Sequence, residues 1–363
     1  MRIILSGGGT MGSVSPLLAV YEKLKDRREV DALWLGTSTG PEAAIVGAYN
    51  IKFSALPAGK FRRYFDWHNL TDIFLILFGF LKSLWLVYRF KPDLVLTAGS
   101  YVCVPVAYAA KVFKKRLIVH QQDLQIGLAN KLMQPLADKI TLAVSELRDK
   151  YSQPDKLVVT GNPTRDFLFH GLSERAVTRF SLAPELPVLL IMGGGVGSEI
   201  INKVFIESAA KLTEFCQVIH AVGKGDQTKW LLSPAIENNR RYHAVEFLGP
   251  ELADVYAATT VFFGRAGFGT LTELAALGKP AVVMPIPDNQ QEKNAEFFHR
   301  QKAVVYVRQA DFSGEYIINL LADLLSRPKR LSELSLNIQR VLPEQAADKY
   351  AELICDLLGE FDS

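Results

Sequence analysis

Short apolar runs and longer helical stretches alternate along this 363-residue chain. Each apolar run is followed by a segment whose apolar positions recur every three or four residues, the pattern of parallel strands joined by helices. The sequence therefore predicts an α/β protein with doubly wound parallel sheets, helical from about residue 325 to the end. The expected strands are 3–5, 32–35, 94–96, 117–119, 140–142 and 157–159, then 188–191, 217–221, 243–247, 260–263, 281–284 and 303–306.

Two glycine-rich turns each follow a predicted strand and precede a predicted helix. Residues 7–13 read Gly-Gly-Gly-Thr-Met-Gly-Ser, and residues 193–198 read Gly-Gly-Gly-Val-Gly-Ser. Glycine lets a ligand approach the main chain closely, and the N-terminus of the following helix favours a phosphate. For either turn alone, a tight strand-to-helix connection without a ligand is an equal alternative. The pair predicts two nucleotide-type domains facing each other across a cleft.

Chain length and turn residues suggest where the domains divide. At roughly 150 residues per domain, the length indicates two domains. Gly161, Asn162 and Pro163 follow the last predicted strand of the first half and form the natural hinge. We expect a first domain over 1–161, a second over 162–342, and a terminal helix at about 343–363 that packs back on the first.

Charge is distributed unevenly between the two halves. Residues 1–163 hold 21 Lys and Arg against 13 Asp and Glu, or +8, whereas the remaining 200 residues hold 20 against 25, or −5. The first half is therefore the candidate for contact with an anionic partner. The cysteines, at 103, 216 and 355, are scattered without metal-ligand spacing, which favours a reducing, cytoplasmic compartment. The N-terminus enters a core strand directly, so we expect no signal peptide.

Residues 73–88 form the most apolar stretch, interrupted by Lys82. Sixteen residues fall short of the roughly 20 that a membrane span needs. A buried helix and a helix lying on a membrane are equally compatible with this stretch. Its basic and aromatic neighbours suit a surface attracted to acidic lipid head groups. These neighbours are Lys60, Arg62, Arg63, Trp67, Lys82, Trp85, Arg89 and Lys91.

A dehydrogenase fits the sequence poorly. Gly7, Gly9 and Gly12 satisfy the dinucleotide-binding fingerprint, but that fingerprint expects an acidic residue at the end of the second strand. Here the strand ends Trp-Leu-Gly-Thr at 34–37, so NAD binding is disfavoured. Neither glycine turn ends in the Lys-Ser/Thr of a P-loop.

The segment 264–294 carries the most informative chemistry. A strand leads into glycines and then a helix with Thr270 and Glu273, which places backbone donors for a pyrophosphate and a carboxylate for a ribose diol. On spacing alone, a capping box formed by these two side chains is the stronger reading. Gln290 and Gln291 change that balance, because two adjacent amides are poor core residues and good ligands for sugar hydroxyls.

At these residues the chain resembles the MurG family. These inverting GT-B glycosyltransferases move N-acetylglucosamine from UDP-GlcNAc to a lipid-linked muramyl-peptide, converting lipid I to lipid II. The resemblance runs nearly end to end and is most specific over 265–294. It implies two Rossmann-like domains, an N-terminal one for acceptor and membrane, a C-terminal one for the UDP-sugar, and a peripheral location on the cytoplasmic face of the plasma (inner) membrane. The matching segments are the two glycine turns, 97–101, 120–123 with Asn130, 161–165 and 265–294.

The resemblance implies a donor site in the second half of the chain. Phosphate contacts would come from Arg165, Gly194, Gly195, Phe268, Gly269 and Thr270, uracil contacts from Phe247 and Leu248, the ribose contact from Glu273, and GlcNAc contacts from Gln290 and Gln291. Arg165 and the N-terminus of the helix that carries Thr270 would stabilise the departing UDP. We therefore expect no metal site and no obligatory cofactor, UDP-GlcNAc being a substrate.

The resemblance also implies an acceptor site and a membrane-docking helix in the first half. Acceptor contacts would come from Thr10, Met11, Gly12, Ser13, Gly99, Ser100, Tyr101, Asp123 and Asn130, and membrane contacts from Phe74, Leu75, Leu77, Phe78, Leu81 and Trp85. The expected partners are UDP-GlcNAc, a polyprenyl-pyrophosphate-linked muramyl-peptide and an anionic membrane surface. No nucleic-acid partner is expected.

Two departures from the family pattern affect the chemistry. Ser13 stands where the family usually has a histidine proposed to activate the acceptor, and a serine cannot act as a general base. Asp123 and His120 are the candidate bases, with Ser13 positioning the acceptor; alternatively His120 is a structural histidine and Asp123 a loop cap. Gly195 replaces a serine, which removes one hydrogen bond to a charged group, about 1.5–3 kcal/mol of donor binding.

Two other functions stay open from the sequence. One is a related GT-B transferase with another lipid-linked acceptor, which the changes at Met11 and Ser13 favour. The other is a catalytically weak homologue that binds a nucleotide sugar or lipid, which the missing histidine favours.

Overall fold

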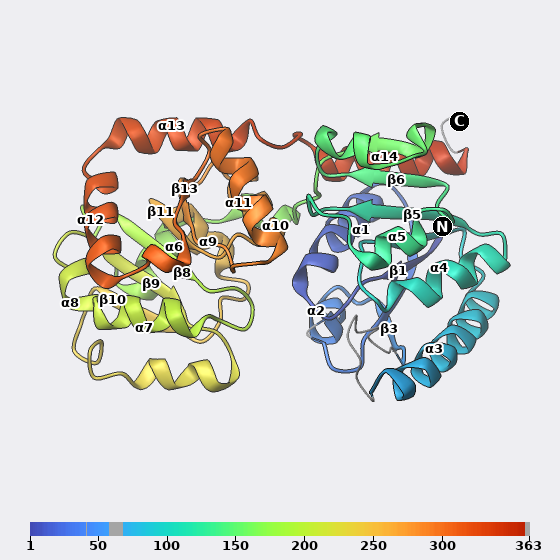
Figure 1. Cartoon of the computed structure of the whole chain (residues 1–363), viewed down its shortest axis with the longest axis horizontal. Helices are drawn as coiled ribbons and strands as arrows, with labels where there is room; N and C mark the ends of the chain where they lie inside the picture. Colours follow the sequence, from blue (N-terminus) through green and yellow to red (C-terminus); the bar gives the residue numbers. More distant parts are fainter. Residues whose placement is uncertain (41, 58–67, 360–363) are drawn as a thin grey trace. The chain divides into compact units, whose positions relative to one another are not determined.

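The computed structural model describes residues 1–40, 42–57 and 68–359 of the chain. The chain divides into two compact units (Figure 1), an N-terminal unit of Met1–Arg165 with Pro343–Ser363 and a C-terminal unit of Asp166–Leu342. The division after Arg165 lies slightly beyond the boundary predicted at 161/162. Arg165, which we assigned to the donor domain, therefore belongs to the N-terminal unit.

The N-terminal unit is built on a seven-stranded sheet in the order β3-β2-β1-β4-β5-β6-β7, with every neighbouring pair parallel. Strands this deeply buried are apolar on both faces, as in β1, where Ile3, Ile4 and Leu5 are fully buried. The sequence did not predict β3, because it is a four-residue strand at the edge of the sheet and none of its residues is buried. The strands are β1 Arg2–Ser6, β2 Asp31–Gly36, β3 Lys52–Ala55, β4 Leu94–Thr97, β5 Arg116–Gln121, β6 Lys139–Leu142 and β7 Leu157–Val159.

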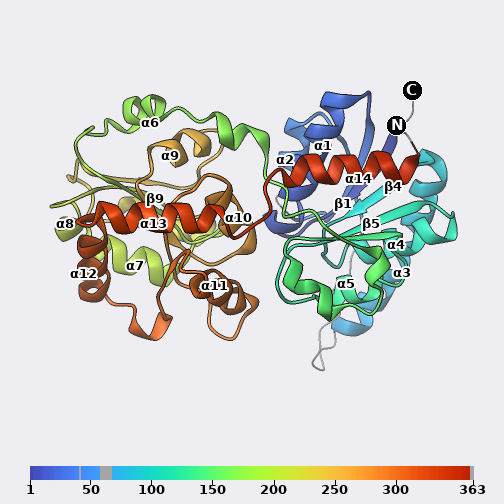
Figure 2. The same cartoon turned by 90° about the horizontal axis from the view of Figure 1, so that it is seen from above.

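Helices cover this sheet, and the last helix of the chain is one of them. Helix α14 packs against α1 (Figure 2), and its Tyr350 is fully buried in the same apolar cluster as Leu17 and Trp34. The helices are α1 Ser15–Arg27, α2 Glu42–Ala48, α3 His68–Phe90, α4 Cys103–Val112, α5 Leu128–Met133 and α14 Ala346–Leu358, with 3-10 turns η1 Met11–Ser13, η2 Ser145–Lys150 and η3 Pro154–Lys156.

The C-terminal unit repeats the same topology in a six-stranded parallel sheet, β10-β9-β8-β11-β12-β13. Both sheets thus have the strand order of a Rossmann fold. The bounds differ most from the prediction at two strands: β10 begins and ends earlier than 243–247, and β13 keeps only the last two residues of 303–306. The strands are β8 Val188–Met192, β9 Gln217–Ala221, β10 Tyr242–Val245, β11 Val261–Gly264, β12 Ala281–Val283 and β13 Val305–Tyr306.

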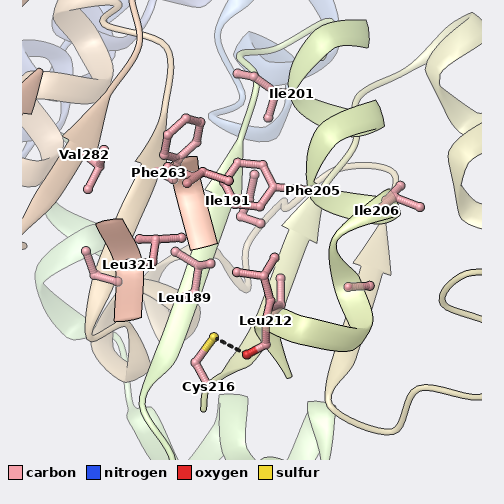
Figure 3. Packing of buried hydrophobic residues seen from close by; sticks show 14 of the residues in the cluster. Leu189, Ile191, Ile201, Phe205, Ile206, Leu212, Cys216, Phe263, Val282 and Leu321 are labelled. Atoms are coloured by element: carbon pink, nitrogen blue, oxygen red, sulfur yellow. Dashed lines mark hydrogen bonds between the residues drawn. The ribbon is translucent and has the colours of Figure 1, made fainter. Parts of the chain in front are cut away.

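The core of the C-terminal unit joins this sheet to its helices (Figure 3). Phe205 of α7 packs edge-on against Phe263 of β11, with ring centroids 4.7 Å apart, and Phe312 stacks on Phe263 at 5.4 Å. The helices are α6 Ser173–Phe180, α7 Glu199–Glu207, α8 Ala209–Leu212, α9 Leu252–Ala258, α10 Phe268–Ala276, α11 Gln290–Arg300, α12 Gly314–Leu325 and α13 Pro328–Gln339, with 3-10 turns η4 Asp166–His170, η5 Gly225–Leu232 and η6 Gln309–Asp311.

The two glycine loops occupy equivalent places in the two sheets. Loop 7–13 follows β1, and loop 193–198 follows β8, the strand at which each sheet reverses its order. Ligands of open α/β sheets bind outside the carboxyl ends of the strands at this reversal point. The topology therefore places both loops where a binding site is expected.

Candidate active site

A cavity of about 590 Å³ opens at the carboxyl ends of the strands of the C-terminal unit. Segments distant in sequence line it, because parallel strands bring their following loops to one edge of the sheet. The lining residues are 192–200 in and beside the glycine loop, Arg265, Gly267 and Thr270 after β11, Ile286, Pro287 and Gln291 after β12, and Gln309.

The glycine loop bends tightly beneath this cavity. Gly194 has a φ of 99°, a left-handed conformation that side chains disfavour, and the Gly197 amide donates to its carbonyl at 3.0 Å. At Gly197 a side chain would overlap the carbonyl oxygen of Val222. Gly195 is different, because no atom lies within 4 Å of the position that its Cβ would take. The loop thus presents backbone to the cavity and leaves room at Gly195.

Helix α10 begins at the cavity with unpaired amides. Its N-cap is Gly267, and its first hydrogen bond runs from the Leu271 amide to the Gly267 carbonyl at 3.0 Å. The amides of Phe268, Gly269 and Thr270 therefore have no partner within the helix, and they form its positive end. The capping-box reading is wrong, since Thr270 is the third residue of the helix and not its N-cap.

Glu273 lies one turn further along α10. It is half-buried, and Tyr256 donates its hydroxyl to Glu273 Oε2 at 3.1 Å. This contact orients the carboxylate, so it can accept hydrogen bonds from a ligand in a fixed position.

Arg265 supplies a positive charge that the sequence analysis did not assign. Its Nη1 donates to the carbonyls of Met284 and Pro285 at 3.2 and 3.1 Å and to Gln309 Oε1 at 2.9 Å, while Nη2 donates to Ser198 Oγ at 3.1 Å. All four acceptors are uncharged, and partial burial lowers the pKa of the guanidinium from its ordinary value. The side chain thus ties three loops together and brings a cation to the cavity, and within the described part of the chain its hydrogen bonds go to uncharged acceptors. Its position directly after a strand, at the carboxyl edge, was the available signal.

The remaining predicted donor residues differ in their placement. Gln291 lines the cavity, and its Oε1 accepts from the Ile286 amide at 3.2 Å, whereas Gln290 is exposed outside the lining. Phe247 is 44% exposed with the Lys224 ammonium 4.8 Å from its ring centroid. The Leu248 side chain is buried, so only its backbone is available to a ligand.

In the N-terminal unit, several predicted acceptor residues meet beyond β1, β4 and β5. Tyr101 lies 3.7 Å from the Cβ position of Gly9, and Asn130 Oδ1 lies 3.3 Å from that of Gly99. Asn130 Nδ2 donates to Gln121 Oε1 at 2.6 Å. The loops that carry the predicted acceptor residues are therefore neighbours at one edge of the sheet.

Ser13 closes its own loop. It is 5% exposed, and its Oγ accepts from the Gly8 amide at 3.0 Å and lies within hydrogen-bonding reach of the Gly8 and Thr10 carbonyls. Its neighbours Thr10, Met11 and Gly12 are less buried. Ser13 therefore shapes the loop, and we do not retain it as a catalytic candidate.

His120 is a structural histidine. It is fully buried, with Nδ1 2.9 Å from Thr141 Oγ1 and Nε2 2.8 Å from Asn162 Oδ1. Burial lowers its pKa to about 4. With both ring nitrogens engaged, it cannot reach a substrate. Asp123 is half-buried in the following loop, so it stays the candidate base.

Two other predicted site residues, Arg165 and Ser100, differ in what the structure shows of them: a contact for the first and a backbone angle for the second. Arg165 interacts with the Tyr49 hydroxyl, whose pKa is raised to about 12 by burial and by Glu22 while Arg165 opposes the shift. Ser100 has a φ of 97°, a strained conformation for a residue with a side chain.

Helix α3 exposes one apolar face. The six predicted membrane residues Phe74, Leu75, Leu77, Phe78, Leu81 and Trp85 are between 40 and 59% exposed. The opposite face packs inward, with Ser83 and Val87 fully buried, and α3 lies beside α4 (Figure 1). The structure excludes a wholly buried helix. Lys60, Arg62, Arg63 and Trp67, which we predicted for the same surface, lie outside the described residues.

Neither a metal cluster nor a membrane span is found in residues 1–40, 42–57 and 68–359. Within them, no three His, Cys, Asp or Glu side chains are grouped to hold a metal ion. No helix in this part of the chain has the length and apolar character to cross a bilayer. The three cysteines are buried and unpaired by disulfides.

Comparison with known proteins places these features in a family. The glycosyltransferase family 28 N-terminal domain matches residues 3–142, and the C-terminal domain of the same family matches residues 188–350. A transferase from Treponema denticola is 31% identical over 384 residues, covering 99% of this chain and 97% of its own length. Its name is UDP-N-acetylglucosamine--N-acetylmuramyl-(pentapeptide) pyrophosphoryl-undecaprenol N-acetylglucosamine transferase.

Solved structures share the fold. The crystal structure of Acinetobacter baumannii MurG has a TM-score of 0.71 and 23% identity, covering 98% of this chain and 99% of that one. A UDP-GlcNAc 2-epimerase from Neisseria meningitidis bound to UDP-GlcNAc also reaches 0.71, at 16% identity and 99% and 100% coverage, so structural likeness alone separates no activities. The matched domains and the full-length sequence identity are more specific. They show that the chain belongs to glycosyltransferase family 28 and, within it, to the MurG family of GT-B enzymes.

Proposed function

We propose that this protein is an inverting glycosyltransferase that moves GlcNAc from UDP-GlcNAc to undecaprenyl-pyrophosphoryl-MurNAc-peptide, converting lipid I to lipid II. The observation that carries the proposal is the 31% identity to a transferase of that name over 99% of this chain. The cavity in the C-terminal unit supports it, because a cation, helix-end amides and polar side chains converge there.

The donor would bind in this cavity. The diphosphate would lie between the glycine loop and the start of α10, where backbone amides and Arg265 offer donors to an anion. Glu273, held by Tyr256, would accept from the ribose hydroxyls. Gln291 would contact the GlcNAc hydroxyls from within the cavity, with Gln290 at its margin.

Transfer would depend on charge stabilisation at the leaving group. As the bond to the anomeric carbon breaks, negative charge would build up on UDP, and the α10 N-terminus and Arg265 at the cavity would stabilise it. Arg165 would add a second cation. We propose that these groups make a divalent metal and any other cofactor unnecessary.

The acceptor would bind to the neighbouring loops of the N-terminal unit. Its hydroxyl must lose a proton as it attacks, and Asp123 is the proposed general base. His120 is excluded by its two occupied nitrogens, and Ser13 by its bonds within the loop.

The lipid tail implies a membrane, and α3 is the proposed docking element. Its exposed apolar face ends at Trp85, Tyr88, Arg89 and Lys91, which line a cavity of about 310 Å³ with Arg89 5.9 Å from the Trp85 ring centroid. Aromatic and basic side chains together suit the boundary of an anionic bilayer. We propose peripheral binding at the cytoplasmic face of the plasma membrane.

Activity is tested by incubating the protein with UDP-GlcNAc and a soluble lipid I analogue and measuring UDP and disaccharide. Gln291→Ala should raise the donor KM about ten-fold or more, as expected for losing hydrogen bonds to a bound sugar. Gln290→Ala is the matched control and should change the donor KM less, because Gln290 lies outside the cavity lining. Donor hydrolysis alone, or transfer only to other lipids, indicates the related transferase; binding without turnover indicates the weak homologue.

Membrane docking is tested by co-sedimentation with vesicles containing anionic lipid. Replacing Phe78 and Leu81 by serine should reduce binding strongly without unfolding, because both side chains are exposed. Leu336→Ser, at a residue of α13 that is 53% exposed, is the matched control. Equal binding of all three proteins contradicts the assignment.

A further inference from the structure

Glu42 is a buried carboxylate directly beneath loop 7–13. It is the first residue of α2 and is 0% exposed. Its Oε1 accepts from the Thr37 amide at 2.6 Å and from the Thr37 hydroxyl at 2.5 Å, and its Oε2 accepts from the Gly9 amide at 3.2 Å. Thr37 Oγ1 in turn accepts from the Gly40 amide at 3.0 Å. One side chain thereby joins the loop after β1 to the loop after β2.

Three glycines make room for this carboxylate. A side chain at Gly8 would overlap Glu42 Oε1, and one at Gly40 would overlap Oε2. The Cβ position of Gly36 lies 3.0 Å from Glu42 Cγ. None of these three has a positive φ, so space and not backbone conformation excludes other residues there. The loop after β1 and the segment from the end of β2 to Gly40 are thus fitted around Glu42.

Stability alone does not account for such an arrangement. Taking a carboxylate out of water is unfavourable, and a well-packed apolar residue of the same volume is often equally or more stabilising. The bond from the Gly9 amide to Glu42 instead restrains loop 7–13. Glu42 lies beyond the end of β2 and is buried, so it cannot take the role of the ribose-binding carboxylate that the dinucleotide fingerprint places at the end of the second strand.

The restricted segment is the one that carries predicted acceptor residues. Gly9, whose amide Glu42 holds, is followed by Thr10, Met11 and Gly12, and the Cβ position of Gly9 lies 3.7 Å from Tyr101. We propose that Glu42 is a positioning residue for the acceptor, holding loop 7–13 in the conformation that orients the attacking hydroxyl. The proposal rests on the proposed function. Misplacement of a reacting group by about 1 Å can lower a rate by about 10²-fold.

The test compares Glu42→Gln with wild type. The amide has the same shape, but its nitrogen cannot accept, so one of the three bonds is lost. We expect kcat/KM for the lipid I analogue to fall 10- to 100-fold while the donor KM changes less than two-fold. Peptides covering 7–13 should exchange their amide hydrogens faster. Tyr350→Leu, a core substitution in the same unit, is the control: it should lower the unfolding midpoint and leave the acceptor KM within two-fold.

The outcomes separate the possibilities. Equal losses in donor and acceptor kinetics, or unchanged exchange in loop 7–13, overturn the proposal. If Glu42→Gln does not fold, Gly8→Ala is the second variant, because its methyl group displaces the same carboxylate. Normal acceptor kinetics in Gly8→Ala overturn the proposal. If wild-type protein transfers to no lipid-linked acceptor, the proposed function fails. In that case, amide hydrogen exchange in loop 7–13 still tests whether Glu42 holds the loop. Equal exchange in wild type and Glu42→Gln overturns that role of Glu42.

Discussion

Gly195→Ser should strengthen donor binding. The substitution restores the hydroxyl that the MurG family pattern carries at this position of the glycine loop. The structure can accept it, because nothing lies within 4 Å of the new Cβ and the φ of Gly195 is outside the left-handed range. A hydrogen bond to a charged group contributes about 1.5–3 kcal/mol, which corresponds to a decrease of about 10- to 150-fold in the Kd for UDP.

Titration calorimetry of UDP and uridine against both proteins measures this change. The gain should appear with UDP and not with uridine, because only UDP carries the phosphates. Gly194→Ser is the matched control: the same hydroxyl is added one residue earlier, where a φ of 99° strains any side chain, so binding or stability should fall. An unchanged UDP affinity in Gly195→Ser, or an equal gain with uridine, refutes the placement of the phosphates at this loop.

Four other predictions follow from the site and the core. Burial lowers the pKa of His120 to about 4 and that of His220 to about 3, so the unfolded chain takes up protons first as the pH falls below about 6.5. Each of these two histidines should then remove about 1.4 kcal/mol of unfolding free energy from its unit per pH unit between pH 6 and 4, measured by urea denaturation. His120→Gln should flatten this dependence for the N-terminal unit, and a pH-independent stability contradicts the prediction. Glu273→Ala should raise the donor KM at least ten-fold with a nearly unchanged melting temperature, and an unchanged KM counts against the ribose contact. Arg265→Lys cannot span the same four acceptors and should weaken UDP more than uridine in calorimetry, whereas equal effects on both ligands would indicate a purely structural arginine. Asp123→Asn should lower kcat about 10²-fold or more with little change in donor KM, and a fully active variant rules this carboxylate out as the base.

Most of the fold could be predicted because parallel strands buried on both faces are uniformly apolar. Ile3 to Leu5 and Val188 to Ile191 are visible in the sequence for that reason. The β3 strand could not be recognised in the same way. It is the edge strand beside β2, and all four of its residues are exposed or partly exposed, so their polarity resembles that of a loop.

The candidate site was predictable where its chemistry comes from consecutive residues. Glycines followed by Thr270 indicated the start of α10, although the capping-box spacing pointed to a different helix boundary. The partners of Arg265 could not be predicted, because they lie 19 to 67 residues away and meet only through the sheet order. The same is true of His120, whose structural role depends on Thr141 and Asn162.

The two glycine loops show what a local motif determines and what it leaves open. Both follow the strand at which a sheet reverses, and both turn directly into a helix, so motif and topology agree on the backbone. Their electrostatics are opposite: the first loop donates an amide to the carboxylate of Glu42, and the second contacts the guanidinium of Arg265 through Ser198. These charged residues lie 33 and 67 positions from the loop atoms that they bind. A phosphate bound at the second loop would meet a positive charge already in place, whereas at the first loop the Gly9 amide is already engaged by Glu42. The chemical difference between the loops therefore comes from long-range packing, and the glycine pattern alone could not have predicted it.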